Sequence, residues 1–208
     1  MKPISDFFPR MLPYLPGCSE PLAAQAVLDA AIAFCEDTQA VREQLDSFTT
    51  SAGVGAYELD TPSQQQVARV FDVVVDGRPM AAIAAEDVGP ASEAIGSPMA
   101  FYTTRYGSEF LLHLFPTPDG AYNVQVRAAL RPTRNATQLE DDLFNLWSDA
   151  VLAGAMARVM AIPGQPFSDP AGSAGYSMAA TRATNKARVE GNFGRVRAGM
   201  RVRGRPFA

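Results

Sequence analysis

The sequence contains few of the residue types on which catalysis, metal binding and disulfide frameworks depend. Its 208 residues include two cysteines, Cys18 and Cys35, and a single histidine, His113. Two cysteines without a recognisable spacing are too few for a disulfide framework or a metal site. The histidine falls in an apolar strand pattern without an acidic neighbour, so it lacks the orienting partner that a general base needs. We therefore expect no enzyme activity, no metal and no cofactor.

Long apolar runs and nucleotide-binding motifs are also missing. No run approaches the roughly 20 apolar residues that a membrane-spanning helix needs, and prolines interrupt residues 1–17, where a signal peptide would be continuously apolar. Gly53 and Gly55 do not complete a dinucleotide-binding fingerprint, and no Gly-Lys-Ser/Thr phosphate loop occurs. Cys35 lies within an apolar helical pattern, so we expect a buried free thiol and synthesis in a reducing cytoplasm.

Charge is distributed unevenly along the chain. The apolar fraction of 47% and the charged fraction of 19% are ordinary for a globular domain, and the net charge is −4. Residues 182–208 hold eight arginines and lysines and one glutamate, a net charge of +7, which leaves −11 for residues 1–181. This asymmetry is the strongest compositional signal in the sequence, and it is typical of a segment that binds a partner.

Residues 137–161 have the pattern of one long helix that is buried by its neighbours. Thr137 and Glu140 have the spacing of a capping box, and Pro163 marks the end. Apolar residues recur at helical spacing, while alanines and a glycine make one side small enough for another backbone to approach closely. Four residues of the apolar stripe are predicted to anchor the core: Leu143, Trp147, Val151 and Met156.

The N-terminal region is predicted to contain an arm followed by a helix. Five of the sixteen prolines lie within the first 21 residues, so we expect residues 1–18 to form an extended arm. Both its own domain and a neighbouring subunit remain open as the surface beneath it. An alanine-rich apolar face then predicts a helix over residues 19–48, provided that Asp37 and Thr38 do not break it.

Strand patterns follow, and then a second C-terminal helix. Residues 54–132 hold short valine-rich or alternating runs, with a hairpin-turn signal at Asp76 and Gly77. Apolar and polar residues alternate over residues 122–127, as in a strand with one wet face. Asp169 and Pro170 resemble a helix N-cap followed by proline at the first helical position. We expect this helix to end near residue 190 and a basic tail to occupy residues 191–208.

Three stretches in this order carry a family likeness. They are the strand pair LLHLFPTPDGAYNVQVRAALRPT, the helix LFNLWSDAVLAGAMARVMA, and the loop PGQPFSDPAGSAGY, which leads into a helix with an arginine-rich end. Together they resemble the adaptor proteins (head-to-tail connectors) of tailed bacteriophages. The resemblance covers about two thirds of the chain, from residue 67 onward. Phe167 stands where the family often has tryptophan, and the N-terminal third matches only in having an alanine-rich helix.

The resemblance implies an α+β fold with a defined plan. A helical bundle is formed by the long N-terminal helix of residues 19–48 and two C-terminal helices within residues 137–190. It carries an inserted antiparallel, sandwich-like β-rich region over residues 54–132 and an extended basic C-terminal tail over residues 191–208. We therefore expect a structural protein of the virion.

The resemblance also implies how such a protein works. It would form a ring, usually a dodecamer, that joins the phage portal to the tail around the DNA channel and lets the genome pass at ejection. The expected partners are further copies of the chain, the portal protein, a tail or nozzle protein, and channel DNA bound without sequence specificity, but no membrane. The expected location is the neck of the virion, after synthesis in the cytoplasm of the host bacterium.

In such rings the C-terminal segment typically docks on the portal, and that role falls here on residues 191–208. The segment has too few apolar residues to fold alone, so we expect it to be mobile in the free subunit and to become ordered on a partner. The residues that would dock on the portal are Arg195, Arg197, Arg201, Val202, Arg203, Arg205 and Phe207.

Two hypotheses from other functional classes remain open. The end of the chain, GRVRAGMRVRGRPF, interleaves arginine and glycine, which favours a nucleic-acid-binding module. The charge of −11 on the rest of the chain and the shortage of aromatic residues in the tail oppose that reading. The third hypothesis is an enzyme with a hidden site built on Cys35 and His113, although Cys35 has no activating surroundings in the sequence.

Overall fold

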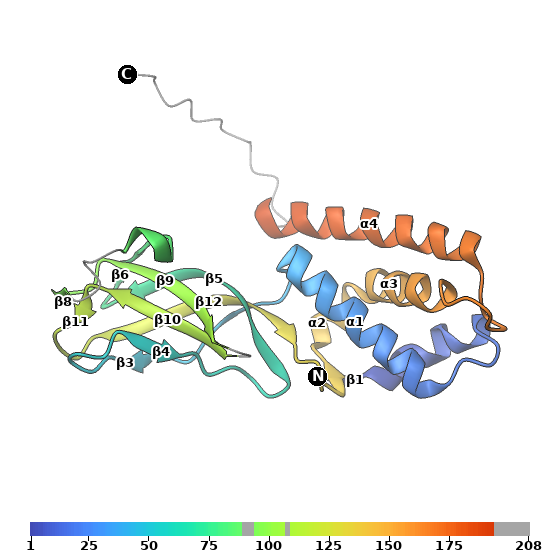
Figure 1. Cartoon of the computed structure of the whole chain (residues 1–208), viewed down its shortest axis with the longest axis horizontal. Coiled ribbons are helices and arrows are strands. Elements are labelled where there is room, and N and C mark those ends of the chain that lie inside the picture. Colours follow the sequence, from blue (N-terminus) through green and yellow to red (C-terminus); the bar gives the residue numbers. More distant parts are fainter. Residues whose placement is uncertain (89–93, 107–108, 194–208) are drawn as a thin grey trace, which may run out of the picture.

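The computed structural model describes residues 1–88, 94–106 and 109–193, which form two halves lying side by side (Figure 1). One half is built of helices and the other of β-strands, and this confirms the predicted mixed α+β class. The last helix lies along the outside of the helical half, with its C-terminal end nearer the strands (Figure 1).

Three longer helices and one short helix make up most of the helical half: α1 (Glu20–Thr38), α2 (Asp141–Asn145), α3 (Ser148–Met160) and α4 (Pro170–Phe193). α3 packs against both α1 and α4. The α1–α3 contact depends on small residues, because a Cβ atom on Gly154 would lie only 3.1 Å from the Cβ of Ala30. The predicted cap of α4 is confirmed, since Asp169 Oδ1 accepts the Gly172 N–H at 2.9 Å.

The prediction that the first helix runs to residue 48 is wrong. α1 ends at Thr38, and Gln39 follows in the left-handed conformation, with φ of 53° and its N–H bonded to the carbonyl of Cys35. Beyond this turn the chain forms β2 (Arg42–Gln44) and β3 (Phe48–Thr49), both paired with a long strand. The buried residues Val41 and Leu45 therefore flank β2 and do not lie on a helix.

The prediction of one helix over residues 137–161 is also wrong. Gln138 and Leu139 form β13, which pairs with β1 (Lys2–Pro3), and a break at Trp147 (φ −124°) separates α2 from α3. Thr137 does not cap a helix: its N–H and hydroxyl donate to Gln64 Oε1 at 2.6 and 3.1 Å. Glu140 Oε2 accepts a hydrogen bond from Gln65 Nε2. Both predicted capping partners are therefore bound by residues 64 and 65 and not by each other.

The N-terminal arm is not extended. It forms two 3₁₀ helices, η1 (Ile4–Arg10) and η2 (Leu12–Tyr14), and it packs on its own domain. Phe7, Met11 and Leu15 are among the most completely buried side chains of the chain, with exposures of 0%, 0% and 1%. Proline disrupts α-helix, and the short 3₁₀ turns formed here still bring these three apolar side chains into the core.

The strand half consists mainly of two sheets. One has the order β4 (Ala56–Glu58), β10 (Glu109–Phe115), β9 (Ala100–Tyr106) and β7 (Ala81–Ala82). The other has the order β2, β12 (Asn123–Pro132), β5 (Gln65–Val75) and β6 (Arg78–Pro79), with β3 also paired to β12. A short parallel pair, β8 (Ile95–Gly96) and β11 (Thr117–Pro118), closes one end, and η3 (Ala85–Asp87) follows β7.

Local predictions for the strands hold. The turn between β5 and β6 has Asp76 at φ of 46° and Gly77 at φ of 77°, as a two-residue hairpin requires. On β12, Val124 and Val126 are buried while the residues between them are exposed. From residue 128 to residue 130 the alternation stops and every residue is buried, because this part of β12 also packs against α1. Both halves therefore share one core.

The close α1–α3 approach leads to a first prediction. Gly154→Leu should destabilise the chain by about 1–3 kcal/mol, because a larger side chain has no room against Ala30 and must separate the helices. Gly175→Leu on α4 is the matched control: nothing lies within 4 Å of its Cβ position, and leucine favours helix over glycine. Urea unfolding of the two variants measures the difference, and equal midpoints would contradict the packing described here.

Candidate functional site

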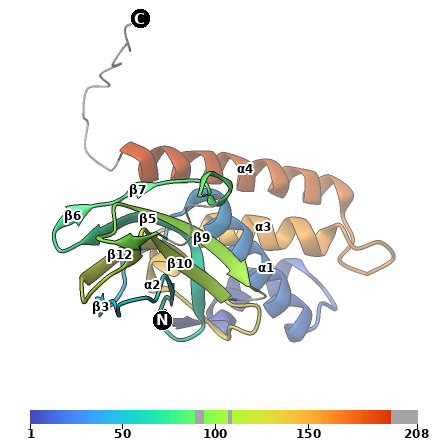
Figure 2. The same cartoon turned by 60° about the vertical axis from the view of Figure 1, so that its left-hand side comes forward.

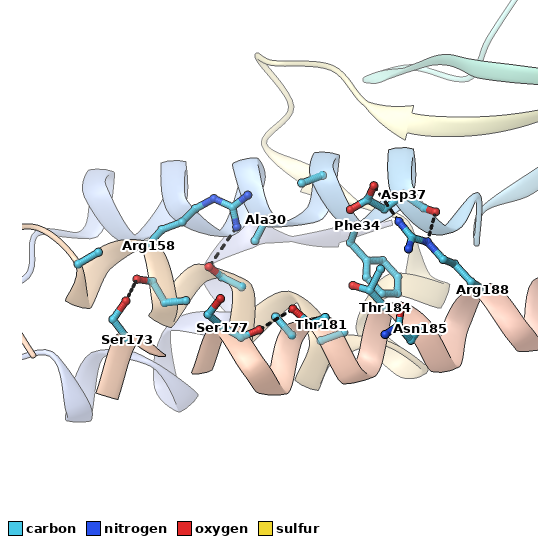
Figure 3. Close-up of a pocket in the computed structure, with 16 residues that line it drawn as sticks. Ala30, Phe34, Asp37, Arg158, Ser173, Ser177, Thr181, Thr184, Asn185 and Arg188 are labelled. Atoms are coloured by element: carbon cyan, nitrogen blue, oxygen red, sulfur yellow. Dashed lines mark hydrogen bonds and ion pairs between the residues drawn. The ribbon is translucent and has the colours of Figure 1, made fainter. Parts of the chain in front are cut away.

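A groove of about 530 Å³ lies between α1, α3 and α4. Figure 3 shows it in close-up, with the labelled polar side chains of α4 directed toward α1 and α3. Most of its wall residues are small or hydroxyl-bearing, and Asp37, Arg158 and Arg188 add charge. The other wall residues include Ala30, Ala33, Phe34, Ala150, Gly154, Ala157, Ser177, Ala180, Thr181, Thr184 and Asn185.

Two polar contacts hold α4 in place along this groove. Near its beginning, the Ser173 hydroxyl donates to the carbonyl of Ala157 on α3 at 2.8 Å. Near its end, Arg188 donates from Nε to the carbonyl of Asp37 at 2.9 Å, and its Nη2 lies 3.1 Å from a carboxylate oxygen of the same residue (Figure 3). Because Ala187 is the one buried residue of α4 within the described part, these contacts supplement a thin apolar stripe.

Arg158 gives the groove a positive charge that no described carboxylate balances. Its Nη1 donates to the carbonyl of Gly154 at 3.1 Å, and it forms no ion pair with the residues that the structure covers. The groove therefore combines small side chains, which admit another backbone, with an arginine that can receive an acidic side chain. Its chemistry suits contact with a protein segment.

The four predicted core anchors differ in their burial. Leu143, Val151 and Met156 are 0%, 0% and 2% exposed and belong to the main core. Trp147 is only partly buried; it stands at the start of α3, and its ring centroid lies 5.5 Å from that of Phe34. Its aromatic contact links the α2–α3 break to α1.

The predicted portal-docking residues, Arg195, Arg197, Arg201, Val202, Arg203, Arg205 and Phe207, lie outside the described residues. The structure does correct where the tail begins. α4 continues through Phe193, three residues beyond the predicted helix end, so the segment that follows the fold is residues 194–208.

The hidden Cys35–His113 site is not assembled. Cys35 is buried on α1, and burial, with a smaller contribution from the charge of Glu36, raises the pKa of its thiol to about 12. His113 lies on β10 in the other half, where its ring stacks on Tyr102 at 4.5 Å and its Nε2 is 2.8 Å from the Thr104 hydroxyl. Burial lowers its pKa. An un-ionised thiol far from the imidazole cannot act as a nucleophile with it.

Metal sites and membrane-spanning helices are absent from the described part of the chain. Within residues 1–88, 94–106 and 109–193, no cluster of three or more histidine, cysteine, aspartate or glutamate side chains could hold a metal ion. None of the described helices is long and apolar enough to cross a membrane.

Sequence reasoning missed several residues that organise this region. Gln64, at φ of 63°, accepts hydrogen bonds from the backbone of residues 137 and 138 and so redirects the chain before α2. Arg158 and the Arg188–Asp37 pair were also missed. These interactions join segments far apart in the sequence, and no periodic pattern signals them.

Comparison with known proteins gives one family. The model of the family described as SU10 adaptor protein matches residues 8–205, which is nearly the whole chain. None of the curated proteins matches the chain. The family match includes the N-terminal third, where the sequence likeness had been confined to an alanine-rich helix.

The environment of His113 leads to a second prediction. Because burial lowers its folded-state pKa below the ordinary 6.5, the unfolded chain takes up this proton first as the pH falls. The contribution of neutral His113 to stability is therefore present above about pH 6.5 and lost as the pH falls through the folded-state pKa. His113 is the single histidine of the chain, so His113→Gln should remove a decline in urea midpoint between about pH 7.5 and 5.5. Parallel midpoint curves for the two proteins would contradict this.

Proposed function

The chain belongs to the SU10 adaptor protein family, and we propose that it forms a ring that joins the phage portal to the tail around the DNA channel. As a member of this family it is a structural adaptor protein of a bacteriophage, a component of the virion that associates with other head or tail proteins. Beyond family membership, we propose that the protein forms a ring in the neck of the virion and that its partners are the portal and a tail protein. The family match over nearly the whole chain is the observation that carries it.

The described structure supports a role in assembly. α4 has a single buried residue among those described, yet it spans residues 170–193 and leaves a groove open along α1 and α3. A long helix that is mostly exposed, next to a groove lined by small residues, offers surface that a neighbouring protein can cover. Arg158 adds a charge to that surface that no described carboxylate pairs with. We infer that α4 and its groove face another subunit or the portal.

The arginine-rich segment 194–208 supplies the contact to the portal in this proposal. It contains five arginines and no acidic residue, and it continues from the end of α4. An acidic groove on the portal would receive the guanidinium groups in forked pairs with carboxylates, and Val202 and Phe207 would fill small pockets.

A reconstitution experiment tests the function as a whole. The purified chain is mixed with purified portal rings and imaged by negative-stain electron microscopy. We expect a ring of the chain on one face of the portal, with the central channel open. A chain that stays monomeric and unbound at micromolar concentrations of both proteins would overturn the proposal.

The tail gives the third prediction. Removal of residues 194–208 should leave a folded, soluble subunit, because α4 ends before this point, but the subunit should no longer bind portal rings. Affinity for duplex DNA should change little. Circular dichroism checks the fold, and sedimentation with portal rings and fluorescence anisotropy with labelled DNA measure the two affinities.

A matched variant separates docking from nucleic-acid binding. It replaces the five arginines of the segment by lysine: Arg195, Arg197, Arg201, Arg203 and Arg205. Lysine keeps the charge but cannot form a planar fork, so portal binding should weaken while non-specific DNA binding stays similar. If the truncated chain still binds portal, and the intact chain binds DNA with an affinity that falls steeply with salt, the segment is a nucleic-acid arm instead.

A further inference from the structure

The sheet β4-β10-β9-β7 has two edges that are free over part of their length. β4 pairs with β10 on one side, and no described strand lies on its other side. At the opposite edge, β7 accompanies β9 only at Ala100 and Phe101. Figure 2 brings β9 and β10 to the front of the molecule. A free strand edge exposes N–H and C=O groups that can pair with another strand.

On β9 the outward-facing groups belong to Thr103 and Arg105. The Ile83 N–H donates to the carbonyl of Phe101 at 2.9 Å, so odd-numbered residues of β9 face away from β10. After Ile83 the chain turns away into η3. The outward backbone groups of Thr103 and Arg105 have no backbone partner among the described residues.

On β4 the outward-facing groups belong to Ala56 and Glu58. The carbonyl of Gly55 accepts the Leu114 N–H at 2.9 Å, and Tyr57 lies opposite Leu112, so odd-numbered residues of this strand face β10. Ala56 and Glu58 therefore direct their backbone groups to the free side, and both residues are exposed.

The two edges are compatible in direction. β4 and β9 both run antiparallel to β10, so they run parallel to each other. β7 already pairs with the start of β9 in the parallel sense. A β4 strand from a second copy can therefore continue the position of β7 along β9 without reversing either sheet. Such a head-to-tail contact uses a different surface on each side, and it closes into a ring when the rotation per subunit allows.

The charges at the two edges are opposite. The free part of β9 borders a cleft of about 430 Å³ against β5, lined by Arg69 and Arg105 among other residues. Both arginines are exposed, and neither forms an ion pair with a described residue. The free edge of β4 carries Glu58 and, just beyond it, Asp60, both exposed and likewise outside the ion pairs of the described chain. Arg69 and Arg105 would repel the arginine-rich segment 194–208, so this cleft suits an acidic strand better than that segment.

We propose that neighbouring subunits join by strand addition, with the acidic β4 edge of one copy paired in parallel to the Thr103–Arg105 edge of β9 in the next. This inference rests on the proposed ring and names its contact surfaces. The backbone pairs set the position of the subunits, and Glu58 and Asp60 meet the arginines at the cleft. The sheet then continues from one subunit to the next.

Charge-reversal variants test the pairing. Arg105→Glu and Glu58→Arg should each raise the concentration for half-maximal assembly by about tenfold or more, because each sets like charges against one another across the contact. Mixing the two variants should restore assembly, since every junction of an alternating ring then joins opposite charges. Arg78→Glu, on β6 of the other sheet, is the matched control and should assemble normally. Light scattering with size-exclusion chromatography measures assembly, alone and with portal rings.

Thr103→Pro removes one outward N–H without touching the bonds to β10, and an edge strand tolerates proline there. It should fold with a near wild-type melting temperature and lose assembly. If Arg105→Glu and Thr103→Pro assemble like wild type, or if the mixed variants do not recover, the strand pairing is wrong and the adaptor role stands. If the wild type stays monomeric even with portal rings, the proposed function fails too.

Discussion

The fold depends on a strand, β12, that contributes to the shared core in both halves of the molecule. The first part of β12 alternates buried and exposed residues, because one face meets the rest of the strand half and the other meets water. Its second part, residues 128–130, is buried on both faces between the sheet and α1. Alanine at two of these positions lets α1 approach the strand. The same use of small residues recurs where α1 meets α3 at Ala30 and Gly154.

Sequence patterns predicted the parts of this fold whose causes are local. The hairpin turn at Asp76 and Gly77, the alternation on β12 and the cap at Asp169 each follow from a few adjacent residues. The helices predicted over residues 19–48 and 137–161 were too long, and the second was shortened by a distant partner. Gln64 takes the hydrogen bonds that would have formed a capping box at residue 137. No spacing in the sequence shows that residue 64 lies there.

The candidate surfaces were less predictable than the fold. An adaptor has no reaction for which particular residue types are needed, so its function leaves no motif comparable to a metal or nucleophile site. The likeness to phage adaptors came from the order of elements from residue 67 onward, and the family match extends it to residues 8–205. Arg158 and Arg105 looked like ordinary surface charges in the sequence. They stand out only once the structure shows which carboxylates are within reach.

An exposed strand edge is a hazard for a soluble subunit, since any other strand can pair with it. Charged residues at such an edge reduce unwanted pairing, and here the two free edges of one sheet carry opposite charges. Two β9 edges would set arginines against each other, and two β4 edges would set carboxylates against each other. The pairing of β4 with β9 avoids both conflicts. Symmetric dimers through these edges are thus disfavoured by the same charges that favour a head-to-tail contact, and head-to-tail contacts are the kind that build rings.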